Sequence, residues 1–193
     1  MSIIDVVKKL LGLAGADSAT QAAVGGIMQS VSASRQAAEN EDMLDAYSAQ
    51  QYTSKIAWQV ADLNLEYVQE ALLKKDYDYA VYNMEGLEES CRDFIQEMRE
   101  EEPDEDVGGD MTLVQAAKAH AEAFAKLLPS LRKIIELYRA SNGEKTPEIE
   151  AAQEAFNREN TALTDEWNNA LNAFMAKHNI PAESVLEGMA DRD

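Results

Sequence analysis

Apolar residues recur at alternating spacings of three and four positions along four stretches of this chain. Such spacing is typical of a helix whose apolar seam packs along a partner helix. The clearest seam consists of Leu113, Ala117, His120, Phe124, Leu127, Leu131, Ile134 and Tyr138. The pattern predicts an all-α fold, an up-down antiparallel four-helix bundle with an N-terminal helical extension.

The apolar stripes and the breaks between them place four long helices. We expect these helices at about residues 43–74, 77–103, 111–141 and 147–178. Their short connections place consecutive helices antiparallel as neighbours. The first helix carries apolar stripes on two nearly opposite sides, which indicates that it lies between other helices. Pro129 falls inside the third helix without disturbing its seam, so we expect a kink there and not an end.

Residues 1–40 form a segment of their own in this interpretation. An amphipathic helix is predicted from Ile3 to Ala14, followed by a helical segment that Gly25 and Gly26 interrupt. Residues 41–193 then form the bundle, which ends in a short C-terminal helix. We expect the apolar face of the first helix to dock on the bundle or on a second subunit. The alternative is that residues 1–40 bind a membrane surface.

The charge of the chain narrows the choice of partners. Its formal net charge is −19, which disfavours direct binding to nucleic acid, because a phosphate backbone requires lysines and arginines. A protein partner with a basic surface is the natural complement. Cys91 is the only cysteine and no apolar run is long enough to span a bilayer, so we expect a cytoplasmic protein.

The common catalytic and metal-binding signatures are absent from the sequence. A di-iron bundle needs Glu-x-x-His pairs, but Ala117 and Met175 stand three residues before the two histidines. Cys91 occupies a seam position, which favours a packed side chain over a reactive thiolate. We therefore expect no enzyme, no cofactor and no metal site.

Two polar residues interrupt the seams. His120 lies in the third predicted helix, and Asn160 lies in the fourth between apolar seam residues. One interpretation is a buried switch or a ligand contact, because histidine changes its charge between pH 5 and 8. The other interpretation, which we favour, is that these residues fix the register of the helices or lie at a partly exposed edge.

The acidic block between Glu85 and Asp110 holds twelve carboxylates and only two arginines. Several of its carboxylates crowd the C-terminal turn of the second helix, where the helix dipole makes them unfavourable by about 0.3–1 kcal/mol each. Their retention there indicates either a surface for a basic partner or a solvated helix end. The segment from Asp104 to Asp110 departs from a calcium-binding EF-hand loop, because Gln115 stands where the loop needs its bidentate glutamate.

Tyrosines near the start of the second helix add a second surface feature, which is either an interface or the rim of a core. The predicted partner-binding residues are Glu97, Glu100, Glu101, Glu102, Asp104, Glu105, Asp106, Tyr79 and Tyr82. The sequence thus predicts a non-enzymatic bacterial protein that binds a basic protein partner, as an immunity protein, antitoxin or secretion chaperone does. The alternative is a structural or membrane-associated component that acts through its N-terminal amphipathic helices; self-association is compatible with both.

Overall fold

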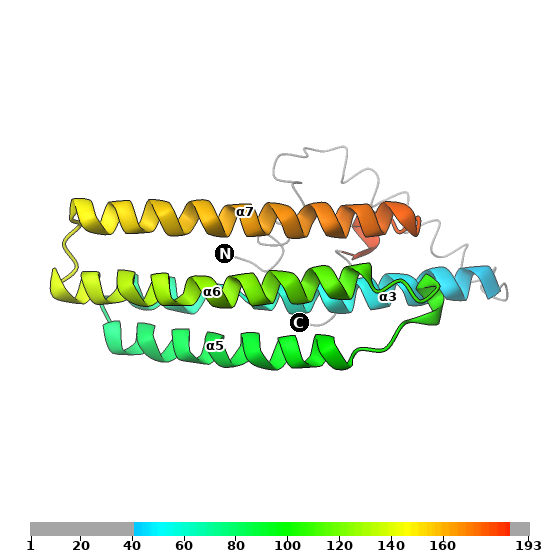
Figure 1. Ribbon diagram of the computed structural model, residues 1–193, viewed down its shortest axis with the longest axis horizontal. Helices are drawn as coiled ribbons and strands as arrows, with labels where there is room; N and C mark the ends of the chain where they lie inside the picture. Colours follow the sequence, from blue (N-terminus) through cyan, green and yellow to red (C-terminus); the bar gives the residue numbers. More distant parts are fainter. Residues whose placement is uncertain (1–40, 186–193) are drawn as a thin grey trace.

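The computed structural model of the chain describes residues 41–185 (Figure 1). The predicted N-terminal extension and the last part of the predicted C-terminal helix lie outside this range. The elements are α3 (Glu41–Asp62), α4 (Glu66–Leu73), α5 (Tyr77–Glu100), the 3-10 turn η1 (Glu105–Val107), α6 (Thr112–Ala140) and α7 (Pro147–Lys177). The described part of the chain contains no strand, so the predicted all-α fold is confirmed.

Helix α6 lies at the centre of the bundle. It packs against α3, α5 and α7, and Figure 1 shows α5, α6 and α7 running side by side in alternating directions. The predicted seam of α5 is fully buried: Ala80, Met84, Leu87, Cys91, Phe94 and Met98. α6 continues through Pro129, as predicted, and contributes the most buried side chains of any described helix.

The prediction of one continuous helix over residues 43–74 is wrong, because the chain forms two helices there, α3 and α4. Asn64 provides the physical reason: its Nδ2 donates to the carbonyl oxygens of Ala61 and Asp62, and its Oδ1 accepts from Glu66 N at 3.0 Å. One side chain thereby satisfies backbone groups at the end of α3 and the start of α4. The break also ends one of the two apolar stripes predicted for this helix. Tyr67, which lies beyond the break, is 63% exposed and does not continue the stripe.

The turn between α6 and α7 requires a glycine. Gly143 has a φ of 80°, and a Cβ at this position would lie 2.7 Å from Lys75 Cε and 2.8 Å from the Tyr77 hydroxyl. Lys75 Nζ also donates to the carbonyl oxygen of Asn142 at 3.1 Å. The α6–α7 turn therefore packs closely on the α4–α5 turn, and both turns are held at the same end of the bundle.

Candidate functional site

Eight carboxylates and one arginine lie between residues 97 and 110, at the end of α5 and in its connection to α6. Two of these carboxylates bind side chains of α3. Lys55 Nζ donates to both oxygens of Glu101, at 3.1 and 3.0 Å, and Gln59 Nε2 donates to Glu97 at 2.7 Å. The ammonium offsets negative charge at the negative end of the α5 dipole. Glu97 and Glu101 therefore hold α5 against α3.

The remaining predicted acidic residues provide the negative surface of the connection. Four of them are exposed: Glu100, Glu102, Glu105 and Asp106. Asp104 is half-buried, and its Oδ1 accepts from Asp106 N at 2.8 Å, which caps the start of η1. Gly108 follows η1 with a φ of 62°, a left-handed conformation that glycine adopts without strain. The connection is thus a turn with a defined backbone conformation that contacts α3 through η1.

Asp110 has an internal role at the start of α6. Its Oδ2 accepts from Lys177 Nζ at 2.6 Å and from His178 Nε2 at 2.8 Å, both at the C-terminal end of α7. Its Oδ1 accepts from the backbone and the hydroxyl of Thr112. The bond from Lys177, helped by those from His178 and Thr112, holds the pKa of Asp110 well below its usual range. This carboxylate links the start of α6 to the end of α7, and both of its oxygens already accept hydrogen bonds from residues of the chain.

A shallow hollow of about 300 Å³ lies between α3 and η1. We call it the acidic hollow; its lining includes Tyr47, Gln51, Tyr52, Lys55, Asp104 and Asp106. The Tyr52 hydroxyl is buried and has no hydrogen-bond partner among the described residues. Burial, aided by the carboxylates of Glu101, Asp104 and Asp110, raises the pKa of Tyr52 to about 12. The hydroxyl therefore keeps its proton at neutral pH.

The two predicted tyrosines lie far from the acidic hollow. Tyr79 and Tyr82 are exposed and stacked on each other, with ring centroids 6.1 Å apart. They stand near the start of α5, and the fifteen residues from Tyr82 to Glu97 span about 22 Å of helix. The length of α5 therefore separates the two predicted tyrosines from the acidic residues at its other end, and their role as partner contacts stays a prediction.

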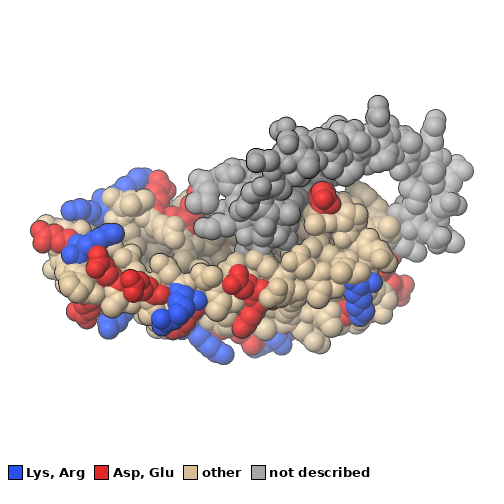
Figure 2. Space-filling model, turned by 90° about the horizontal axis from the view of Figure 1, so that it is seen from above, with Lys and Arg blue, Asp and Glu red and all other residues tan. Residues whose placement is uncertain are grey.

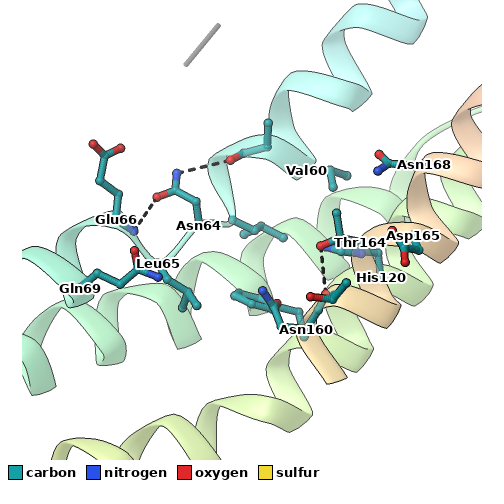
Figure 3. Close-up of a pocket in the computed structure, with 14 residues that line it drawn as sticks. Val60, Asn64, Leu65, Glu66, Gln69, His120, Asn160, Thr164, Asp165 and Asn168 are labelled. Atoms are coloured by element: carbon teal, nitrogen blue, oxygen red, sulfur yellow. Dashed lines mark hydrogen bonds between the residues drawn. The ribbon is translucent and has the colours of Figure 1, made fainter. Parts of the chain in front are cut away.

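A more enclosed pocket, of about 380 Å³, opens at the break between α3 and α4 (Figure 3). Its polar lining includes Asn64, Gln69, His120, Asn160, Thr164 and Asn168, and we call it the amide pocket. Val60, Leu63, Leu65 and Phe124 provide apolar lining. Sequence reasoning singled out His120 and Asn160 but missed the other members, because only the broken helix brings α3 and α4 opposite α6 and α7 here.

His120 is held as a neutral ring in the amide pocket. Its Nδ1 lies 3.3 Å from the carbonyl oxygen of Leu163, which can only accept, so Nδ1 carries the proton. The ring also stacks on Phe124, with centroids 6.3 Å apart. Burial lowers the pKa of His120, which keeps the ring uncharged at neutral pH. The second ring nitrogen, Nε2, is therefore a hydrogen-bond acceptor.

The single cysteine is buried in the core and does not form a reactive site. Cys91 is buried, as predicted, and burial, followed by the nearby Glu88 charge, raises the pKa of its thiol to about 11. Within residues 41–185 no group of three or more His, Cys, Asp or Glu side chains is placed to hold a metal ion. Figure 2 shows acidic and basic side chains interspersed over the described part of the face that it views.

Comparison of the chain with protein-family models, curated proteins and solved structures gives no match. None of the helices described between residues 41 and 185 is long and apolar enough to cross a membrane. The arguments for function therefore come from the geometry of the acidic hollow and the amide pocket.

Proposed function

We propose that this protein is a non-enzymatic binding protein that recognises a basic protein partner through the acidic hollow. The observation that carries the proposal is the position of Asp104 and Asp106 beside the α3 residues Tyr47 and Tyr52. Carboxylates and aromatic rings at one hollow are the groups that bind a lysine or arginine side chain. An immunity protein, an antitoxin and a secretion chaperone are the classes that such recognition suits.

The charge balance at the hollow favours a cationic side chain. Lys55 also lines the hollow, but its ammonium binds Glu101 at 3.0 Å and lies 4.0 Å from Glu97. Asp104 and Asp106 have no ion-pair partner among the described residues. A partner's guanidinium would therefore meet two available carboxylates, and Tyr47, which is 60% exposed, offers a ring for it to lie against.

The rest of the acidic surface supports recognition at longer range. The exposed residues Glu100, Glu102 and Glu105 add negative charge around the hollow without occupying it. Such charge accelerates the encounter with a basic partner and is screened by salt. The binding that we propose therefore weakens as the ionic strength rises.

Capture of partners from the lysate of the native cell tests the proposal. The bait is the full chain, and the informative variant is the double substitution Asp104→Asn and Asp106→Asn. Asparagine at position 104 keeps an oxygen that can cap η1, so the turn is preserved while two charges are lost. We expect the wild-type chain to retain a basic protein at low salt and the variant to lose it.

A matched control variant distinguishes the loss of carboxylates at the acidic hollow from the loss of net charge. Glu154 and Glu159 are exposed on α7, and their joint replacement by glutamine removes the same number of charges. This control variant should retain the partner as the wild type does. Equal retention by all three chains, or equal loss in both variants, would contradict recognition at the acidic hollow.

The alternative function, a structural or membrane-associated component, depends on residues 1–40, which lie outside the described residues. Deletion of this segment is predicted to abolish assembly or liposome binding under that alternative, and to leave partner capture unchanged under ours.

A further inference from the structure

The amide pocket contains a hydrogen-bonding group for which the described residues provide no partner. Asn168 Oδ1 is buried, and no donor among the described residues lies within hydrogen-bond distance of it. A buried acceptor without a partner is unfavourable and is rare in folded proteins. His120 Nε2 adds a second acceptor, because the Nδ1 proton is committed to Leu163. The pocket thus offers acceptors that a donor-bearing ligand would satisfy.

The α7 wall of the pocket is rich in such acceptors. Thr164, Asp165 and Asn168 follow one another along this wall, and Figure 3 draws all three beside His120. The Thr164 hydroxyl donates its proton to the carbonyl oxygen of Asn160 at 3.0 Å, so the lone pairs of Thr164 Oγ1 remain free to accept. Asp165 carries a carboxylate at the exposed edge. Oxygen acceptors on one wall match the several N–H donors of an ammonium group.

The opposite side of the pocket provides apolar surface beside the polar side chains of Asn64, Glu66 and Gln69. Val60 and Leu63 come from the end of α3, Leu65 from the break and Phe124 from α6. Among the described residues that line the pocket there is no lysine or arginine, so an anionic headgroup would lose its hydration without gaining a counter-charge. The volume, about 380 Å³, lies near the lower end of the range for small-molecule sites.

We propose that the amide pocket binds a small amphipathic amine. The ammonium group donates to Asn168 Oδ1 and to its acceptor neighbours on α7, and the apolar body of the ligand packs against Leu63, Leu65 and Phe124. This site is separate from the acidic hollow, and neither proposal depends on the other.

Three probes with one apolar body and different headgroups test the ligand class. They are 2-phenylethylamine, 2-phenylethanol and 3-phenylpropionate, titrated into the ¹⁵N-labelled full chain while backbone amide shifts are recorded. The amine should give saturable shifts at residues around the break, such as Asn64 and Leu65, and in α7 around Asn168. The alcohol should bind about tenfold more weakly, since it lacks the charge, and the carboxylate should not saturate. An amine response elsewhere, or no saturable response, would overturn the proposal.

Substitutions on α7 then test where the ammonium group of the bound amine lies. Asn168→Leu replaces the unused amide with an apolar side chain of similar shape, so the thermal midpoint should rise while affinity for the amine falls at least about tenfold. Asn172→Leu is the matched control, because Asn172 is exposed one turn further along α7 and does not line the pocket. A lower midpoint for Asn168→Leu would mean that the fold already uses this amide, and would contradict the proposal.

Asp165→Asn provides a variant with little risk to the fold, because this residue is exposed. It should weaken binding of 2-phenylethylamine and leave that of 2-phenylethanol unchanged. Equal effects on the two probes would show that the site does not recognise the ammonium charge, and would overturn the assignment of the ligand class.

Discussion

The two sides of helix α6 differ in how completely they are packed. On the side of α5 and α7 the seams are continuous, and α5 side chains such as Met84 are fully buried. On the side of α3 and α4 the partner helix is broken at Asn64, and the amide pocket opens there. The acidic hollow also borders α3. The continuous side therefore holds most of the buried core, and the interrupted side carries both hollows in which we propose binding.

The largest effect is expected from a cavity on the continuous side. Met84 lies in the buried seam of α5, has no exposed surface and does not line either hollow. Replacement by alanine should lower the free energy of unfolding by about 2–5 kcal/mol, because the neighbouring helices cannot close around the lost side chain. Chemical denaturation of the variant measures this value. A loss below about 1 kcal/mol would contradict the assignment of this side as the stability core.

A smaller effect is expected at Asp110, which joins α6 to α7 by its bonds to Lys177 and His178. Asp110→Asn should cost about 1–3 kcal/mol, because hydrogen bonds to a charged group are stronger than neutral ones. Urea denaturation at neutral pH measures the difference between the two chains. A variant as stable as the wild type would show that this connection contributes nothing.

The carboxylate of Asp110 gives the stability of the wild type a pH dependence that Asp110→Asn lacks. Since the pKa of Asp110 is lower in the folded chain than in the unfolded one, its stabilisation is present above about pH 4 and is lost as the pH falls towards the folded pKa. Asp110→Asn lacks this titration. The difference in stability between the wild type and the variant should therefore shrink on acidification below about pH 4, and a constant difference would contradict this role.

The smallest changes in stability are expected at two neighbouring acidic residues, Glu101 and Glu102. Glu101 binds Lys55 and only 17% of its side chain is exposed, so Glu101→Gln should cost about 1 kcal/mol. Glu102→Gln, at the exposed neighbouring position, should change stability by less than about 0.5 kcal/mol. Thermal melts of both variants under one set of conditions compare them. Equal effects would remove the distinction between a structural and a surface carboxylate at the end of α5.

The continuous side could be predicted from the sequence because its signal is repeated many times. The seam of α5 repeats a buried apolar residue every three or four positions, and Thr146 followed by Pro147 marks the start of α7. The helix seams alone therefore fix the fold class, even where a proline such as Pro129 stands inside a helix.

The break and the pocket could not be predicted in the same way. Asn64 breaks the helix through its own hydrogen bonds, but the apolar residues Leu63 and Leu65 on either side continue the helical pattern. The polar residues His120 and Asn160 gave a signal, yet their meeting with Asn64 depends on how the α3–α4 break packs on α6 and α7. The separation of Tyr82 from Glu97, by contrast, follows from the length of the helix that the sequence predicts over residues 77–103.

The central claim is that Asp104 and Asp106 form a specific site for a basic side chain. A titration of the ¹⁵N-labelled full chain with an arginine-rich peptide tests it most directly. We expect saturable amide shifts at Tyr47, Tyr52 and η1 that weaken with salt and disappear in the Asp104→Asn, Asp106→Asn variant. Shifts spread evenly over the acidic surface, or unchanged in the variant, would contradict the claim.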